Sequence, residues 1–397
     1  MQKLTQIKTQ LLFMQDEAVL RQLHEFHLAD SVHVCIKNQK YLLMASNNYL
    51  GLTHHPAVKA AAVSAVEEYG TGSGGSRLTS GNHPLYGLLE QDIARFKQTE
   101  TALIFNSGYM SNIGTISALA NTAADVIFSD ALNHASIIDG CRLARAKTVI
   151  YPHSNMAALA NLLKNTPCSG QRFIITDGVF SMDGDIACLE KIVYLAEKYD
   201  GFVIVDDAHA TGVIGIGGRG TAVYYGLCGR IQLELGTLSK ALAAEGGFAA
   251  GSQLVIDYLT NKARSFIFST ALSPATLAAA RAALQVLLTE PYRVERLALK
   301  AARIKDKLTL AGVHLLKSET PIVPIRIGAA SQSMDFAEKL YAEKLIVSAI
   351  RPPTVPVGSS RLRLTITDAH LVEDIDKASD IIIHAARTMG IMNSLNK

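Results

Sequence analysis

Short apolar runs, most of them bounded by Gly, Asp or Ser, recur through the middle of this chain. The six clearest are TALIFNSG (101–108), DVIFSD (125–130), KTVIYPH (147–153), RFIITDGV (172–179), FVIVDDAHA (202–210) and QLELGTLS (232–239). Helical patterns separate several of them, as in NMAALANLLKN and CLEKIVYLAEKYD. Strands that alternate with helices predict an α/β fold, with a mostly parallel sheet covered by helices on both faces. Continuously apolar strands are typical of such doubly covered sheets.

The two ends of the chain have a different texture. The first 45 residues predict an amphipathic helix and then a short hairpin, in which VHVCI and YLLMAS flank the turn residues Asn38-Gln39-Lys40. From about residue 288, charged helices surround short strands, which predicts a smaller α+β domain. We therefore expect an N-terminal helix-and-hairpin segment (1–45), a large α/β domain (46–287) and a C-terminal α+β domain (288–397).

Composition excludes several classes of protein. The chain is 49% apolar and 18% charged, with a formal charge of +3 and no dense Lys/Arg block, so we expect no nucleic-acid partner. No apolar run reaches membrane-spanning length, and the N-terminus does not resemble a targeting peptide, which predicts a cytoplasmic protein without membrane contact. The five cysteines are scattered without a Cys-x-x-Cys pair, so we expect reduced thiols and no metal site.

Glycine-rich stretches occur at 69–81 and at 215–220, but neither lies between a strand and a helix as a dinucleotide-binding fingerprint requires. The stretch FNSGYMSNIG is more informative, because a strand ends at Asn106 and Ser107-Gly108-Tyr109 begins a helical pattern. Backbone N–H groups at such a helix start bind phosphate well. Taken alone, the Ser-Gly pair is equally consistent with an ordinary N-cap.

In FVIVDDAHATG, the two acids Asp206 and Asp207 follow the apolar strand, and His209 follows Asp206 by three residues. Taken alone, this motif is consistent with an acid that caps the next turn and with a structural histidine. Lys240, however, follows the next strand, so both strand ends are expected to face one cleft. An amine, an acid and a phosphate-binding helix start are the groups that pyridoxal 5′-phosphate needs.

The same residues belong to a series of motifs that resembles the α-oxoamine synthases, which are fold-type I pyridoxal-phosphate enzymes. The motifs are SNNYLGL (46–52), GSGGSR (72–77), SDALNHASIIDG (129–140), GVFSMDGD (178–185), VDDAHATGVIG (205–215), GTLSKAL (236–242), FSTALSP (268–274) and IRPPTVPVGSSRLRL (350–364). They occur in order over nearly the whole chain. The resemblance implies a fold-type I transferase with a seven-stranded sheet, and a homodimer with shared active sites. Ala243 stands where the family usually has glycine.

The resemblance also assigns roles to single residues. It implies that Lys240 binds the cofactor covalently and then acts as the base, and its small apolar neighbours predict that it is buried, with a lowered pKa. Asp206 is expected to hold the ring nitrogen protonated and His134 to stack on the ring. His209, with Ser181 nearby, is expected to contact the phenolic oxygen. The phosphate is expected to bind the backbone of Gly108 and Tyr109, together with Thr237 and, from the partner subunit, Ser269 and Thr270.

The substrate residues implied by the resemblance lie mostly near the two ends of the chain. Arg363 is expected to bind the amino-acid carboxylate. Alternation along the strand places Arg361 on the same face, and one of the two arginines could equally be a solvent-exposed side chain. Arg351 and Thr354 are expected to line the acyl side, and Arg21, placed on the N-terminal helix, to bind the far carboxylate of the acyl chain. Asn47 and His134 complete the expected substrate contacts.

Within the family, IRPPTVP, FSTAL and the GSGGS loop favour one reaction. This is the condensation of L-alanine with pimeloyl-CoA or pimeloyl-acyl carrier protein to 8-amino-7-oxononanoate, a step of biotin biosynthesis. One alternative is the 2-amino-3-ketobutyrate CoA ligase reaction of the same family, which joins glycine to acetyl-CoA. A non-catalytic binding protein and a dinucleotide oxidoreductase are alternatives from other classes.

Overall fold

The computed structural model describes residues 2–17, 19–21 and 23–392. Their contacts divide the chain into two compact units. The large unit contains Asn48–Ser181 and Asp185–Arg296, and the small unit contains the described residues of 1–47, 182–184 and 297–397. The division into three parts at residues 45 and 287 stays a prediction.

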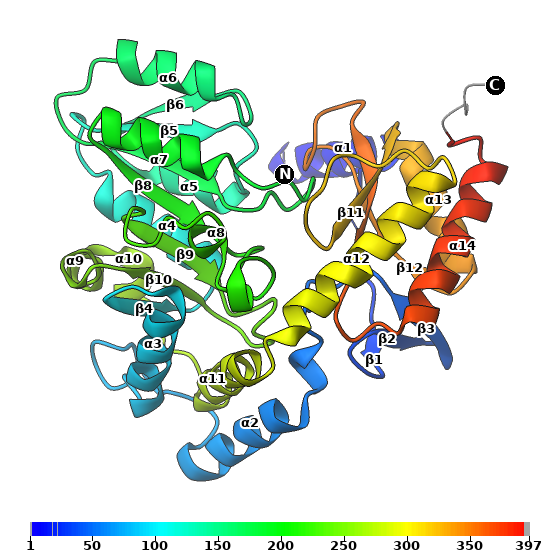
Figure 1. Cartoon of the computed structure of the whole chain (residues 1–397), viewed down its shortest axis with the longest axis horizontal. Coiled ribbons are helices and arrows are strands. Elements are labelled where there is room, and N and C mark those ends of the chain that lie inside the picture. The colour runs from blue at the N-terminus through cyan, green and yellow to red at the C-terminus, as the bar shows by residue number, and fades with distance from the viewer. Residues whose placement is uncertain (1, 18, 22, 393–397) are drawn as a thin grey trace. The chain divides into compact units, whose positions relative to one another are not determined.

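A seven-stranded sheet forms the centre of the large unit, with helices on both faces (Figure 1). Its strands lie in the order β4-β10-β9-β8-β7-β5-β6, and every neighbouring pair is parallel except the two pairs that involve β10. The strands are β4 (Thr101–Phe105), β5 (Val126–Asp130), β6 (Lys147–Tyr151), β7 (Arg172–Asp177), β8 (Gly201–Asp206), β9 (Leu233–Thr237) and β10 (Gly247–Gly251). This architecture confirms the predicted α/β fold and its mostly parallel seven-stranded sheet.

Strand β10 is the strand of this sheet that the sequence pattern did not predict. Gly247–Gly251 pairs on both sides, with β4 and β9. Gly and Ala have low β propensity, so the pattern carried no strand signal. Glycine is needed at the start of β10, because a Cβ added to Gly247 would lie 2.5 Å from the carbonyl oxygen of Ser107.

Side chains alternate along the strands, and this alternation gives the sheet an apolar core on each face. On β5, Ile127 enters one core, whereas Val126 and Phe128 enter the other. The first core includes residues of α4 (Gly108–Leu119) and α5 (Ala135–Leu143), and the second includes residues of α6 (Met156–Asn165) and α7 (Leu189–Lys198). The remaining helices of this unit are α2 (Pro56–Tyr69), α3 (Pro84–Lys97), α8 (Thr221–Tyr224), α9 (Gln253–Lys262), α10 (Arg264–Ile267) and α11 (Pro274–Thr289).

The alternation also separates the two acids at the end of β8. Asp207 forms a buried ion cluster in which Lys97 Nζ lies 2.7 Å from both Asp207 Oδ2 and Glu234 Oε2. Burial by itself lowers the pKa of Lys97, but the two carboxylates outweigh it and raise the pKa above its usual range, so the amine stays charged. Thr221 donates from its backbone N–H and its hydroxyl to Asp207. Asp207 therefore fixes the core, which leaves Asp206 as the acid available to a site.

The small unit contains two sheets and four helices among its described residues. One sheet has the order β1-β2-β3-β12 and the other has the order β11-β14-β13. The strands are β1 (His27–Leu28), β2 (His33–Ile36), β3 (Gln39–Leu43), β11 (Ile322–Gly328), β12 (Leu345–Ile346), β13 (Ser348–Ile350) and β14 (Ser360–Thr365). The helices are α1 (Gln2–Asp16), α12 (Tyr292–Leu310), which starts in the large unit, α13 (Ala330–Ala342) and α14 (Val372–Thr388). Strands β2 and β3 pair antiparallel as the predicted hairpin requires, but the predicted turn was wrong in extent, because Gln39 and Lys40 already belong to β3 and pair with Ile36 and Cys35.

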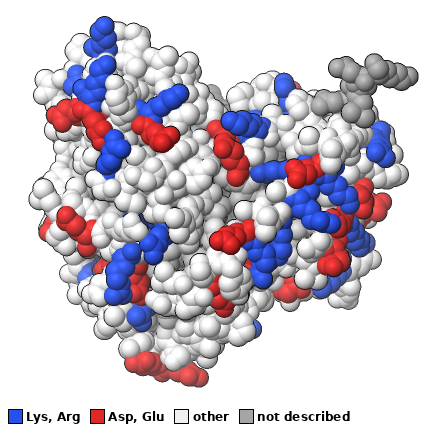
Figure 2. Space-filling view, in the orientation of Figure 1, with Lys and Arg blue, Asp and Glu red and all other residues white. Residues whose placement is uncertain are grey.

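The surface shows no segregation of charge on the face drawn in Figure 2, where basic and acidic side chains are interspersed. Across the described ranges, no helix is both long enough and apolar enough to cross a membrane.

The ion cluster around Lys97 generates a stability prediction. Replacing Lys97 with Met removes the cation and leaves Asp207 and Glu234 buried without it, so the free energy of unfolding should fall by about 3–5 kcal/mol. Urea unfolding of the cofactor-free chain measures this loss. Arg230→Gln is a suitable control, because Arg230 pairs with Glu197 at the surface and should cost at most about 1 kcal/mol. Equal losses in the two variants would contradict this interpretation of the cluster.

Candidate active site

A cavity of about 200 Å³ lies beside the carboxyl ends of β7, β8 and β9 in the large unit. It is lined by Ser107, Gly108, Tyr109, Asn112, His134, Ser136, Asp177, Asp206, Ala208, His209, Thr237, Ser239 and Lys240. This edge is where open α/β sheets bind ligands. The predicted cofactor residues Gly108, Tyr109, His134, Asp206, His209, Thr237 and Lys240 therefore meet in one space.

Helix α4 begins at this cavity. The Ser107 hydroxyl accepts a hydrogen bond from Met110 N at 3.1 Å, so Ser107 is the N-cap, and the first N–H groups of the helix have no partner within it. Gly108 lies close against β9, since an added Cβ would be 3.1 Å from the Cβ of Thr237. A helix start that carries unpaired N–H groups next to a threonine is suited to a phosphate.

Asp206 is buried and held by a network that the sequence did not predict. Asn112 Nδ2 donates to Asp206 Oδ2 at 2.6 Å and to Ser136 Oγ at 2.9 Å. Ser136 Oγ lies 2.7 Å from His134 Nδ1, and Ala208 N donates to Asp206 Oδ1. One chain of hydrogen bonds therefore fixes the acid and the imidazole relative to each other.

A second acid, Asp177, anchors the backbone that carries His134. His134 N donates to Asp177 Oδ2 at 2.7 Å. Burial raises the pKa of Asp177 well above its usual range, and the nearby Asp206 adds to the effect. Burial lowers the pKa of His134; Asp206 opposes this shift, whereas Lys240 adds to it. A neutral imidazole with a fixed backbone is suited to stacking on a flat ring.

Lys240 lies in the turn between β9 and β10. The prediction that it is buried was wrong in degree, because the residue is half-buried, although Leu238, Ala241 and Leu242 around it are fully buried. The turn closes through the Ala244 N–H, which donates to the Leu238 carbonyl. Ala243 has a φ of 53°, in the left-handed region that favours glycine. This conformation explains why glycine would suit position 243.

His209 is held by Tyr49, a contact that the sequence did not predict. The Tyr49 hydroxyl lies 2.7 Å from His209 Nδ1, and both residues are buried. The hydroxyl thereby sets the orientation of the ring. Thr237 Oγ1 in turn donates to the Gly246 carbonyl at 2.9 Å and lies 3.0 Å from Ser239 Oγ.

Three predicted cofactor residues do not line the cavity. Ser181 is the last residue of the large unit before residues 182–184. The Ser269 hydroxyl donates to the Ser265 carbonyl at 2.6 Å, and Thr270 is exposed. Ser269 and Thr270 were expected to act from the partner subunit, so their role stays a prediction.

The predicted substrate residues other than His134 belong to the small unit. Arg363 is buried on β14, where it donates to Thr365 Oγ1 at 3.0 Å and to Asn47 Oδ1 at 3.1 Å. Arg361 is also buried and pairs with Asp183, so the suggestion that one of the two arginines is solvated was wrong. Two side chains of alternating residues on a strand share a face, and here both are held by polar partners.

A second cavity, of about 850 Å³, gathers the predicted acyl-side residues of the small unit. Its lining includes Arg21, Arg351 and Thr354. Arg21 Nη2 donates to Thr354 Oγ1 at 3.3 Å, and Arg351 Nη2 donates to the Leu20 carbonyl at 3.1 Å. The placement of Arg21 on the N-terminal helix was wrong, because α1 ends at Asp16 and Arg21 lies in the segment that follows.

Comparison with known proteins identifies the family. The family described as aminotransferase class I and II matches residues 39–382. A protein of Lysinibacillus sphaericus named 8-amino-7-oxononanoate synthase is 47% identical over 97% of this chain and 99% of its own length. A protein of the same name from Geotalea daltonii is 50% identical over 91% of this chain and 92% of its own. The chain belongs to the α-oxoamine synthase family.

Solved structures of other α-oxoamine synthases have the same fold. A serine palmitoyltransferase from S. paucimobilis, solved with bound PLP and myriocin, is 30% identical, with a TM-score of 0.93 over 98% of this chain and 99% of its own. The 8-amino-7-oxononanoate synthase from Francisella tularensis is 29% identical, with a TM-score of 0.74 over 88% of this chain and 99% of its own.

Some residues of this α-oxoamine synthase site could have been found from the sequence. Asp177 ends its strand just as Asp206 does, and Asn112 lies about one helical turn after Gly108. Tyr49 and Ser136 lie inside motifs that were already recognised. The sequence does not show in which direction each of these side chains points, and only the fold shows which of them face the cavity.

The raised pKa of Asp177 generates a second prediction. When folding raises the pKa of a carboxyl group, the folded state becomes less stable as the pH rises through the folded pKa. The reason is that the buried group must then ionise. Asp177→Asn keeps an acceptor for His134 N and removes that ionisation. At about pH 8 it should unfold at higher urea than the parent, by more than the ~0.5 kcal/mol of an ordinary surface change, and the gain should shrink as pH falls.

Asp139→Asn provides the control of opposite sign. The Tyr109 hydroxyl and Arg142 lower the pKa of the exposed Asp139, so removing its charge should not stabilise the chain. A loss of stability in Asp177→Asn that does not change with pH would contradict this account.

Proposed function

We propose that this chain catalyses the condensation of L-alanine with a pimeloyl thioester, with loss of CO2, to give 8-amino-7-oxononanoate for biotin biosynthesis. The observation that carries this proposal is the amine of Lys240 in one cavity with the Asp206 carboxylate, the His134 imidazole and a helix start. Relatives named 8-amino-7-oxononanoate synthase match nearly the whole chain at 44–50% identity.

The cofactor is pyridoxal 5′-phosphate, and the lining of the cavity fits it. Lys240 supplies the amine for covalent attachment, and Asp206 supplies the anion for the ring nitrogen. The start of α4 and Thr237 suit the phosphate, His134 suits the ring face, and His209 suits the phenolic oxygen. Ser181, which does not line the cavity, is proposed to contact the same oxygen. When bound, the cofactor withdraws electrons from the bonds at the Cα of the amino acid.

The residues of the chain then bind, orient and move a proton. The free amine of Lys240 would remove the Cα proton of the bound L-alanine. The Asp206 carboxylate would bind the ring nitrogen, because Asn112 and the Ala208 N–H hold it in place. The Cα–carbonyl bond would form as CoA or the acyl carrier protein leaves with the thiol. The Cα–carboxyl bond would then break to release CO2, and a proton would return to Cα.

Arg363 is proposed to bind the carboxylate of L-alanine. Its guanidinium is buried and already oriented by Thr365 and Asn47, and a planar fork of donors suits a carboxylate. Fixing the carboxylate would also fix the orientation of the bonds at Cα, so this contact is geometric as well as electrostatic.

Arg21 and Arg351 are proposed to bind the far carboxylate of the pimeloyl chain. The 850 Å³ cavity that they line also has apolar walls from Leu20, Ile350 and Met334. A chain of methylene groups ending in a carboxylate matches this lining. Acetyl and palmitoyl chains carry no terminal charge for the two guanidiniums, which disfavours the glycine and acetyl-CoA alternative.

A homodimer in the cytoplasm is part of the proposal. Helix α1 exposes Leu4, Ile7, Leu11 and Met14 along one side, and every described residue of the helix is solvent-exposed in the single chain. An apolar stripe of this kind is suited to burial against a second copy. A second copy would also bring Ser269 and Thr270 to the phosphate, as the family resemblance implies.

Product analysis tests the proposed reaction. Purified protein supplied with pyridoxal 5′-phosphate should form 8-amino-7-oxononanoate from L-alanine and pimeloyl thioester, and little product from glycine or from acetyl and palmitoyl thioesters. Mass spectrometry of the products measures this preference. Predominant turnover of glycine with acetyl-CoA would contradict the proposal.

Variants of the acyl cavity sharpen the same test. Arg21→Ala should raise the KM for the pimeloyl thioester about tenfold while leaving the KM for alanine unchanged, since a charged hydrogen bond contributes about 1.5–3 kcal/mol. Arg326→Ala removes an exposed arginine on β11 and is the control, expected to behave as the parent does.

A further inference from the structure

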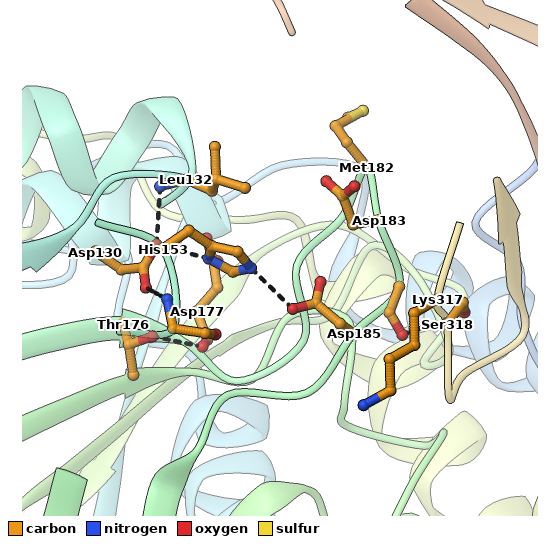
Figure 3. Close-up of polar contacts among 12 residues, drawn as sticks. Asp130, Leu132, His153, Thr176, Asp177, Met182, Asp183, Asp185, Lys317 and Ser318 are labelled. Atoms are coloured by element: carbon orange, nitrogen blue, oxygen red, sulfur yellow. Dashed lines mark hydrogen bonds and ion pairs between the residues drawn. The ribbon is translucent and has the colours of Figure 1, made fainter. Parts of the chain in front are cut away.

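A histidine outside the cavity joins three segments of the large unit. His153 Nδ1 lies 2.9 Å from Asp130 Oδ1, and His153 Nε2 lies 2.9 Å from Asp185 Oδ2 (Figure 3). Asp130 ends β5, His153 follows β6, and Asp185 lies in the loop after β7. We call these three residues the His153 clamp.

The geometry of the clamp defines the charge of its histidine. Both ring nitrogens face carboxylates, which accept but do not donate, so both nitrogens must carry hydrogen. Burial by itself would lower the pKa of His153, but its bonds to Asp130 and Asp185 outweigh burial and raise the pKa to about 10. The ring is therefore an imidazolium, and the clamp contains one cation between two anions.

On one side the clamp fixes the loop that carries His134. The Asp130 carboxylate also accepts from Leu132 N and from Ser154 N, both at 2.9 Å. Ser154 has a φ of 53°, an unfavourable conformation for serine that this bond helps to hold. The short loop from residue 131 to 134 is thus held near its start by Asp130 and at its end by Asp177.

On the other side the clamp fixes the loop that contains Ser181. Phe180 N donates to the Asp185 carbonyl at 3.0 Å, so the two ends of the 180–185 loop are joined. The Phe180 ring packs edge-to-face on His153, with 4.4 Å between the ring centroids. His153 therefore contacts both ends of this loop.

We propose that His153 is a positioning residue, whose imidazolium holds the loop of His134 and the loop of Ser181 in the arrangement that the bound cofactor needs. This inference rests on the proposed function for the identity of the reaction, but the arrangement of the loops can be measured without turnover. Within residues 2–17, 19–21 and 23–392, no group of three His, Cys, Asp or Glu side chains is arranged to hold a metal ion.

The test compares His153→Gln with the parent chain. Gln can still make one hydrogen bond, but it carries no charge and cannot bridge both carboxylates. Three measurements are made: hydrogen exchange of the Leu132 and Ser154 amides in cofactor-free protein, visible circular dichroism of the bound cofactor, and kcat. We expect faster exchange at both amides, a reduced visible signal and a fall in kcat of roughly tenfold to 100-fold, since a displacement of ~1 Å can cost about 100-fold.

His33→Gln is the matched control. His33 is also a half-buried histidine bonded to a carboxylate, with Nδ1 2.9 Å from Asp30 Oδ2, but it lies on β2 of the small unit. The His33→Gln variant should have the same visible circular dichroism signal and the same kcat as the parent. If His153→Gln does not fold, Asp185→Asn answers the same question, because it keeps an acceptor and removes one charge of the clamp.

The outcomes separate positioning from stability alone. A normal visible signal and normal kcat, together with faster exchange at Leu132 and Ser154, would mean that the clamp only stabilises the fold, and would overturn the proposal. A parent protein that binds the cofactor but makes no 8-amino-7-oxononanoate would contradict the proposed function. In that case the visible signal of the variant would still decide the role of His153.

Discussion

The carboxylate of Asp206 is the group on which the rest of the candidate site depends. It ends β8 and accepts hydrogen bonds from Asn112 Nδ2 and from Ala208 N. Asn112 also bonds Ser136, which contacts His134. A displacement of this carboxylate would therefore move α4, the start of α5 and the imidazole together. Because both of its oxygens accept hydrogen bonds, this buried carboxylate is held in place without further rearrangement.

The parallel register of the sheet supplies the constraint behind this arrangement. Asp177 and Asp206 are direct partners in the pairing of β7 with β8, so two carboxyl groups end neighbouring strands. Their proximity adds to the effect of burial in raising the pKa of Asp177. Asp207, one residue further along, turns to Lys97 instead and stabilises the core. Asp206 therefore lines the cavity, whereas the adjacent Asp207 stabilises the fold.

The sequence predicted most of this structure where a local pattern carried the signal. The strand ends located Asp206 and Lys240, and the Ser107-Gly108 pair located the start of α4. What could not be predicted depends on pairing between distant segments. Gly247–Gly251 has no strand propensity of its own and becomes a strand between β4 and β9. Arg361 is buried because Asp183, far away in the chain, pairs with it.

The covalent bond between pyridoxal 5′-phosphate and Lys240 is the central claim, and peptide mapping tests it most directly. Protein loaded with pyridoxal 5′-phosphate is treated with borohydride, which reduces the bond to a stable one. The protein is then digested and analysed by mass spectrometry. We predict that the peptide containing Lys240 carries the reduced cofactor and that no other lysine does so in comparable amount. A cofactor bound at a different lysine, or a protein with no cofactor attached, would contradict the account.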